Sequence, residues 1–246
     1  MRIFDEKKEL DIPKWITASS SASTIQTQTV KLNDRHGEYL TGKEQYGSKT
    51  FQCSGTIPTD SACAVEKERS RLLSLLSGKD LIVYRDDDDT IFYRCRLTGQ
   101  IQITYYNGEN LHKVFTISFT LKAFDPFGYG QRKIETIAGG RRDISIVTEG
   151  NLSTVPEIAI GDIEKVSGLL VHCNGTELKI SREIAIPHGK TLLYKDGTLF
   201  LDGEDYTRLL TLSSIIHPLY FIAGHNTVSI YVPTGTVTVA FNGRYL

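Results

Sequence analysis

The chain has 246 residues, of which 40% are hydrophobic and 23% charged, a composition that excludes a disordered chain and leaves room for two domains or one large β domain. Lysine and arginine number 28 against 29 acidic residues. The balance holds on each side of Gly130, with 17 basic and 17 acidic residues up to it and 11 and 12 after it. Neither half is therefore a basic nucleic-acid module, because sequence-independent binding of phosphates needs a cationic surplus.

The N-terminus and the apolar stretches predict neither a signal peptide nor a membrane span. Met1 to Leu10 carries six charged residues and no apolar core of the kind that signal peptides have. The most apolar stretch, Ser213 to Ala223, is about half the roughly 20 residues that a membrane-spanning helix needs. It also contains His217 and Pro218.

Thr17 to Val30 is the first predicted strand, since it is rich in serine, threonine and β-branched residues. Its two faces differ little in polarity, so the sequence does not determine its register.

The segment between Pro58 and Gly78 predicts one amphipathic helix, over residues 60–77. Thr59 or Asp60 can cap its first amides, and Gly78 can end it in a left-handed turn. Its stripe recurs at spacings of three, four and seven and consists of Ala62, Val65, Arg69, Leu72, Leu73 and Leu76. We interpret this helix as a packing element that covers part of a sheet.

Two hairpins are predicted after the helix. The first pairs Leu81 to Tyr84 with Ile91 to Leu97. The second pairs Gln100 to Tyr106 with His112 to Phe124 across Asn107 to Asn110, where Asn-Gly favours a tight turn.

The tip of the first hairpin carries four consecutive carboxylates, Asp86 to Asp89. They lack the alternating ligands, central glycine and distal glutamate of an EF-hand, and adjacent side chains on a turn splay apart. We interpret them as a solvated turn and assign no metal site.

The chain changes character at Asp125 to Gly130, where proline and glycines interrupt the strand pattern. The next segment, 131–142, carries four basic residues and Gly139-Gly140, which predicts a linker. The predicted organisation is an N-terminal domain over 1–130, the linker over 131–142 and a C-terminal domain over 143–246.

Short strands at regular spacing predict a β-sandwich in the second half. The predicted strands are 144–147, 157–160, 168–171, 177–180, 191–194, 198–202, 209–213, 219–222, 227–232 and 236–241. Tight turns are predicted at Lys195-Asp196-Gly197 and at Ala223-Gly224-His225-Asn226.

No residue pattern predicts catalysis or a cofactor. The six histidines, His36, His112, His172, His188, His217 and His225, stand in no catalytic motif, and the sequence has no nucleophile elbow or phosphate-binding glycine loop. The four cysteines, Cys53, Cys63, Cys95 and Cys173, form no C-x-x-C pair, so neither zinc binding nor thioredoxin-like chemistry is supported. Cys95 and Cys173 lie in strand-like runs and are interpreted as buried thiols, which suits a reducing cytosol. We assign no catalytic, cofactor-binding or metal-binding residue, and leave ligand-binding residues open.

Sugar binding has no specific support either. The second-half aromatic residues lie mostly inside strand patterns, where core packing is their usual role. They are Tyr194, Phe200, Tyr206, Tyr220, Phe221, Tyr231, Phe241 and Tyr245. The single tryptophan, Trp15, lies in the other half.

Short pieces, in their order and spacing, carry a resemblance to a known family. In the first half they are Asp34 to Leu40, Phe51 to Ile57, Leu81 to Tyr84, Phe92 to Leu97, Phe115 to Phe119 and Asp125 to Phe127. In the second half they are Gly150-Asn151, Pro156 to Ile158, Gly224 to Val228 and Arg244 to Leu246. Over nearly its whole length the chain resembles the distal tail protein family, Dit, of siphophages.

The resemblance implies a mainly β fold, with an N-terminal β-sandwich or barrel-like domain that carries one α-helix. The C-terminal domain is then a galectin-like β-sandwich, similar to a carbohydrate-binding module. It implies a structural virion protein of the tail tip, assembled in the host cytoplasm and without enzymatic activity or cofactor. Its homo-hexameric ring, single or stacked, would join the tail tube to tail-tip, baseplate or receptor-binding proteins and leave a channel for DNA. The alternatives are a lectin-like adhesin and another ring-forming tail component such as a tube subunit.

A ring needs strand edges and broad surfaces in preference to a cleft. We expect the edges to come from Thr17 to Val30 and the two hairpins. A net charge near zero is compatible with a channel in which DNA slides. Asp86 to Asp89 fit such a channel and a solvent-facing tip outside the ring equally well.

Overall fold

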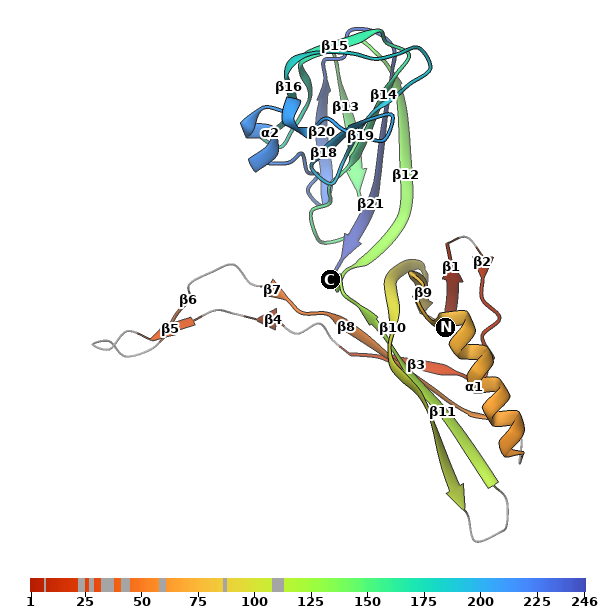
Figure 1. Ribbon diagram of the computed structural model, residues 1–246. Helices are drawn as coiled ribbons and strands as arrows, with labels where there is room; N and C mark the ends of the chain where they lie inside the picture. The colour runs from red at the N-terminus through yellow and green to blue at the C-terminus, as the bar shows by residue number, and fades with distance from the viewer. Residues whose placement is uncertain are drawn as a thin grey trace. The chain divides into compact units, whose positions relative to one another are not determined.

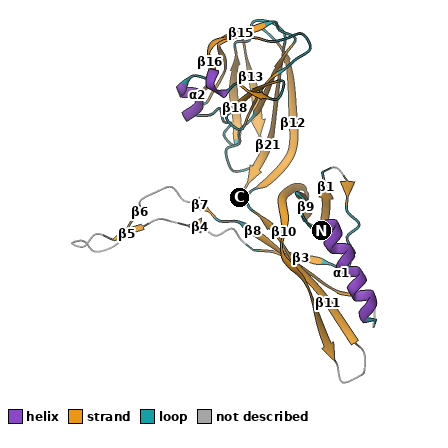
Figure 2. Cartoon of the chain, in the orientation of Figure 1, coloured by secondary structure: helices purple, strands orange, loops and turns teal. Residues whose placement is uncertain are grey.

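A computed structural model describes residues 1–6, 8–21, 25–26, 29–31, 38–40, 45–57, 61–85, 88–107 and 113–246. The chain divides into two compact units, Met1–Gly128 with Leu246, and Tyr129–Tyr245 (Figure 1). Both are built mainly from antiparallel strands, and the longer of the two described α-helices lies in the first unit (Figure 2). The predicted mainly β fold class is confirmed. No helix among these residues is long and apolar enough to cross a membrane.

The first unit is built around one long strand that pairs with two different neighbours. Its strands are, from one edge to the other, β2 (Lys8–Glu9), β1 (Arg2–Asp5), β9 (Leu81–Arg85), β10 (Asp88–Asn107), β11 (Lys113–Ala123), β8 (Lys49–Ile57) and β3 (Thr17–Ser20). The beginning of β10 pairs with β9 and the remainder with β11. Both predicted hairpins are therefore confirmed, although 86–87 and 108–112 in their tips lie outside the described residues.

A bulge separates the two halves of β10. The register against β11 shifts between Thr98 and Gln102, and Gly99 adopts φ +72° within the interruption. Glycine is the residue that takes this left-handed conformation without steric cost, so Gly99 accommodates the bulge within the β10–β11 ladder.

Helix α1 (Ala62–Leu76) packs against β10 and lies within the predicted range. Ser61 caps it, with its hydroxyl accepting a hydrogen bond from Ala64 N at 3.4 Å. The predicted caps, Thr59 and Asp60, lie outside the described residues. At the other end Ser77 N donates to Leu73 O, and Gly78 has φ +70°, as the sequence predicts.

The buried face of α1 is rotated from the predicted stripe. Val65, Leu72 and Leu76 are buried, whereas Ala62, Arg69 and Leu73 are exposed. The segment after β2 covers the flank of α1 that carries Arg71. There Arg71 Nη1 donates a hydrogen bond to Asp11 O at 2.8 Å. The spacing of apolar residues locates a helix but does not say which flank a neighbouring segment covers.

Thr17 to Val30 does not form one strand, which corrects the prediction. Only Thr17–Ser20 pairs with β8. Further along, β4 (Ile25–Gln26) pairs with β7 (Gln45–Tyr46), and β5 (Thr29–Lys31) with β6 (Glu38–Leu40). Because neither face of the segment is apolar enough to be buried, nothing holds it to a single neighbour.

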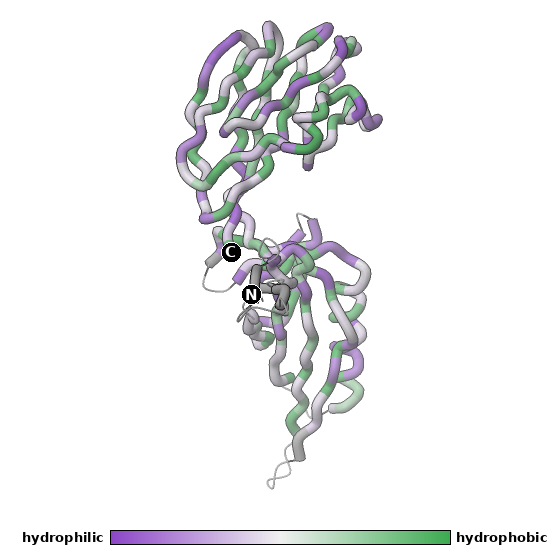
Figure 3. The backbone as a smooth tube through the Cα atoms, turned by 90° about the vertical axis from the view of Figure 1, so that its left-hand side faces the viewer, coloured by the Kyte–Doolittle hydropathy of each residue, from purple (hydrophilic) through white to green (hydrophobic). Residues whose placement is uncertain are grey.

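The second unit is a β-sandwich, as predicted. One sheet has the order β13 (Arg142–Thr148), β20 (Gly224–Ile230), β15 (Lys165–Cys173) and β16 (Thr176–Ala185). The other has the order β12 (Gly128–Ala138), β21 (Thr236–Tyr245), β14 (Glu157–Gly161), β17 (Leu192–Lys195), β18 (Thr198–Leu201) and β19 (Glu204–Asp205). One apolar cluster draws residues from both sheets, and Figure 3 shows hydrophobic positions recurring along these strands. Burial of these facing sides holds the two sheets together.

The prediction of a linker over 131–142 is wrong, because most of this segment belongs to strand β12. Gly139 N and Gly140 N continue its bonding, to Gly235 O at 2.7 Å and Val232 O at 2.6 Å. Two of the four basic residues that predict a linker, Arg132 and Lys133, belong to this strand, and Lys133 forms an ion pair with Glu149. Arg141 and Arg142 follow it, and Arg142 begins β13. A solvent-facing strand and a linker share this composition.

Three further predictions in the second half are wrong. Residues 209–213 end a 3₁₀ helix, η1 (Thr207–Leu209), and begin a short α-helix, α2 (Leu212–Ile216). Residues 219–222 form only an isolated bridge from Phe221 to Thr154, although alternate burial imitates a strand. The predicted turn at 223–226 instead begins β20, where Asn226 is buried and bonded to neighbouring backbone groups. The turn at 195–197 is confirmed, with Asp196 and Gly197 both at positive φ.

Replacement of Leu72 by Asp should prevent soluble folding, because an unpaired carboxylate would then be buried beneath α1. Leu72 is 0% exposed. The expected loss is more than about 4 kcal/mol, measured by soluble yield and thermal unfolding. Leu73→Asp, on the exposed flank of the same helix, is the matched control and should change stability by less than about 0.5 kcal/mol. Normal folding of Leu72→Asp would show that this face of α1 is not a core face.

Candidate assembly surfaces

The histidine, cysteine and acidic side chains of the described residues form no group of three or more that could bind a metal ion. His172 and His225 lie in strands β15 and β20, His188 lies in a loop, and His217 caps α2. His36, His112, Asp86 and Asp87 lie outside the described residues.

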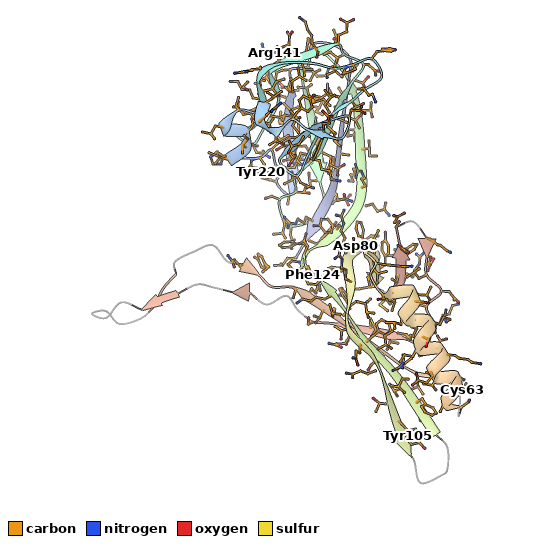
Figure 4. The ribbon with its side chains drawn as sticks, in the orientation of Figure 1. Cys63, Asp80, Tyr105, Phe124, Arg141 and Tyr220 are labelled. Carbon is orange, nitrogen blue, oxygen red and sulfur yellow. The ribbon has the colours of Figure 1, made fainter. Side chains whose placement is uncertain are left out.

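The cysteines separate into three buried thiols and one exposed thiol. Cys53, Cys95 and Cys173 are buried, which confirms the interpretation of Cys95 and Cys173. Burial raises the pKa of the Cys53 and Cys95 thiols to about 12 and that of Cys173 to about 11. Cys63 is exposed on α1 (Figure 4). Because the thiolate is the nucleophile, the three buried cysteines are unreactive in the folded protein.

Several aromatic residues of the second unit pack within it. Tyr194, Phe221 and Phe241 are buried in its core. Tyr220, labelled in Figure 4, lies beside Asn174, whose side-chain amide donates to Tyr220 O at 3.1 Å. The face of Tyr231 is covered by the Arg141 guanidinium, 5.3 Å from the ring centre. These rings pack against the protein rather than standing free for a ligand.

The first unit has an open strand edge at β3. This strand pairs with β8 on one side and ends the order β10, β11, β8, β3. Ser21 N donates to Thr50 O at 2.9 Å, so the alternation of an antiparallel ladder directs the N–H of Ser20 away from β8. The edge consequently presents backbone groups that another strand can bind.

A cavity of about 370 Å³ adjoins this edge. Its lining includes Ala18, Ser19 and Ser20 of β3, Phe51 of β8, and residues 83–85 of β9. A strand that added to β3 would have this space beside it for its side chains.

Gly55 determines how closely the chain before β3 approaches β8. A Cβ atom at this position would overlap the carbonyl oxygen of Trp15 and lie 2.6 Å from Trp15 Cε3 and 3.0 Å from Ile16 Cα. Only glycine leaves space for this backbone. The position of the β3 edge therefore depends on Gly55.

A second exposed surface lies toward the end of the β10–β11 hairpin. The rings of Tyr105 and Phe115 face each other across the two strands, with centres 5.3 Å apart. Tyr105 and Val114 are exposed there, and Tyr105 is labelled in Figure 4. Sequence reasoning named the hairpins as edges, but the exposure of these side chains depends on the fold.

Comparison with known proteins identifies the fold rather than a sequence family. No protein-family model and no curated protein sequence matches the chain. The structure is similar to the crystal structure of the Dit protein of phage SPP1, described as a paradigm of the hub adsorption apparatus of phages that infect Gram-positive bacteria. The TM-score is 0.73 at 15% sequence identity, over 100% of this chain and 99% of that chain. The two-unit fold implied by the family resemblance is thus confirmed as a fold.

Two structures of the phage p2 baseplate in its activated conformation, with Sr and with Ca, match more weakly. The TM-scores are 0.42 and 0.40 at 9% identity, and each match covers 97% of this chain and 96% of that chain. Likeness at this level adds nothing to the fold assignment.

Replacement of Gly55 by Ala should destabilise the first unit by about 1–3 kcal/mol, because the added methyl group overlaps backbone atoms. The melting temperature should fall by several degrees. Gly161→Ala is the control, since a Cβ atom there meets nothing closer than Thr191 Oγ1 at 3.5 Å. Equal melting temperatures for the two variants would contradict the tight approach at Gly55.

Thiol titration of the folded protein with Ellman's reagent at pH 8 should count one reactive cysteine per chain, Cys63. All four should react in guanidinium chloride. Cys63→Ser should remove the native signal completely. Rapid reaction of two or more thiols in the folded chain would show that Cys53, Cys95 or Cys173 is accessible.

Proposed function

We propose that this chain is a structural protein of a phage tail, a distal tail hub whose first unit forms a ring with other copies. The observation that carries the proposal is the match to SPP1 Dit, which spans essentially all of both chains. A shared domain would match one unit only, whereas here both units match in the same chain.

The ring is proposed to be a homo-hexamer, single or stacked, in which the β3 edge is one contact. A closed ring is built from one repeated head-to-tail contact, which needs a donor surface and an acceptor surface on each copy. The backbone groups of β3 and the adjoining cavity supply one of these surfaces. The β10–β11 hairpin, with Tyr105 and Val114 exposed, is the proposed partner surface.

The proposed place of the ring is the virion tail tip, between the tail tube and the tail-tip, baseplate or receptor-binding proteins. Assembly would take place in the host cytoplasm, and DNA would pass through the ring. The formal net charge of −1 supports passage, since a strongly basic ring would bind the phosphates. In the proposed division the N-terminal domain, 1–130, forms the ring and the C-terminal sandwich, 143–246, lies outside it. Asp88 and Asp89 begin strand β10, which corrects their interpretation as part of a turn, whereas Asp86 and Asp87 lie outside the described residues.

Negative-stain images and light scattering of the purified protein should show discrete rings or stacked rings of six copies. Long tubes would identify a tube subunit instead. A protein that stays monomeric at high concentration, alone and with purified tail proteins, would overturn the proposal. Binding to host-wall polysaccharides on a glycan array without ring formation would favour the lectin-like alternative.

Replacement of Ser20 by Pro should abolish ring formation while leaving the chain folded. Proline removes the N–H that points away from β8 and keeps the ladder to β8 intact. Ser20→Ala retains this N–H and should form rings as the unaltered chain does. Circular dichroism of both variants checks the fold. Rings of normal size from folded Ser20→Pro would show that the β3 edge is not the contact.

A further inference from the structure

The sheet formed by β3, β8, β11 and the later part of β10 has one buried and one exposed face, because side chains alternate along each strand. Phe51 and Cys53 of β8, and Ile117 and Phe119 of β11, are buried on one face. Their apolar cluster also contains residues of α1, β1 and β9, so a second layer covers that face. The intervening side chains form the other face and are partly or fully exposed.

Between its two ends this exposed face consists of serine, threonine and glutamine. The register aligns them in rows across the strands, one of which is Gln102, Ser118, Ser54 and Thr17. No aspartate, glutamate, lysine or arginine is among them, although 23% of the chain is charged. We call this set the uncharged face. It consists of Thr17, Ser19, Thr50, Gln52, Ser54, Thr56, Thr98, Gln102, Thr104, Thr116, Ser118 and Thr120.

Two cations mark one end of the uncharged face. Arg96 and Lys122 stand opposite each other in the β10–β11 ladder. Arg96 is paired with Asp80, and the Lys122 ammonium lies 5.1 Å from the centre of the Phe124 ring. Each cation therefore has a contact of its own at the margin of the face.

Hydroxyl and amide groups make this face polar without giving it charge. Thr120 Oγ1 donates a hydrogen bond to Gln52 Oε1 at 2.9 Å, from β11 to β8. Such a surface offers phosphates neither the cations that bind them nor the carboxylates that repel them. A polyanion can therefore move past it without being held.

We propose that the uncharged face lines the channel of the ring and is the surface past which duplex DNA slides. The inference rests on the proposed function. When copies join at the β3 edge, the uncharged faces of successive sheets follow one another around the ring. The inner circumference of a closed ring is shorter than the outer one, so the face without a second layer lies inside. Helix α1 and strands β1 and β9, which cover the other face, then lie on the outer side.

Protection of a thiol by ring closure tests which face lies inside. Ser54→Cys combined with Cys63→Ser places the single exposed thiol in the middle of the uncharged face. The unaltered chain, whose exposed thiol Cys63 lies on α1, is the matched control. In rings we expect position 54 to react with N-ethylmaleimide but not with maleimide coupled to serum albumin, which is too large for a DNA channel. Cys63 should react with both reagents.

The other results of this titration decide against the inference. Reaction of position 54 with the albumin reagent in closed rings, as fast as that of Cys63, would overturn the channel assignment and leave the proposed ring standing. Protection of position 54 from both reagents would show that the face is buried against a second copy, as between stacked rings, and would overturn it as well. Failure of the unaltered chain to form rings would overturn the proposed function together with the inference.

Added charge tests the contact with DNA. Ser54→Lys with Gln102→Lys gives each copy two cations on the uncharged face, which should bind passing phosphates. Phage particles with this double variant should eject their DNA at least several-fold more slowly, and the difference should shrink as the salt concentration rises.

The matched control for this charge test is Ser70→Lys with Ser74→Lys, which adds two cations at exposed positions of α1. Its particles should eject DNA at the unaltered rate. Equal ejection rates for the two double variants would contradict contact between the uncharged face and DNA. Thermal unfolding of both should match that of the unaltered chain, since exposed substitutions change stability little.

Discussion

The backbone ladder of strand β10 is the constraint on which the first unit depends. Its 20 residues bond to β9 over one part and to β11 over the other. This single strand therefore joins the strands β2, β1 and β9 to the strands β11, β8 and β3. The change of neighbour falls between Cys95, which pairs with Leu81 of β9, and Arg96, which pairs with Lys122 of β11. Helix α1 packs on β10, and the order β11, β8, β3 follows from it. The open edge proposed for assembly is the last member of that series.

The edge strands β16 of the second unit and β3 of the first have different surroundings. The segment that carries η1 and α2 runs along β16 and occupies its edge with hydrogen bonds to Lys179 and Ser181. Among the described residues, β3 pairs with β8 alone. Open edges are a liability in a monomer, because they invite pairing with other chains. An assembling protein can use the same property, which links the β3 edge to the proposed ring. The edge of β16 is instead covered by α2, whose outer surface is apolar.

Sequence reasoning succeeded where local chemistry decides the conformation. The hairpins around β10, the α1 helix ended by Gly78 and the Asp196-Gly197 turn follow from strand pattern, helical spacing and tolerance of positive φ. It failed where two structures share a composition. Residues 131–142 resemble a linker but continue a solvent-facing strand, and residues 219–222 alternate in burial without a ladder. Thr17 to Val30 has two equally polar faces, so its pairing was decided by the neighbours that the fold supplies.

The sequence by itself determined the class of the protein: a neutral, mainly β chain in two parts, with one long helix and no motif for catalysis. Ordered pieces of family resemblance indicated the fold that the likeness to SPP1 Dit then bore out. Only the tertiary structure decided which surfaces stay open. Contacts between residues distant in sequence decide whether β3 has a second neighbour and which flank of α1 is covered. They also decide that Leu212, Ile215 and Ile216 face outward. Hydrophobic spacing records that a residue is apolar, whereas its burial depends on what packs against it.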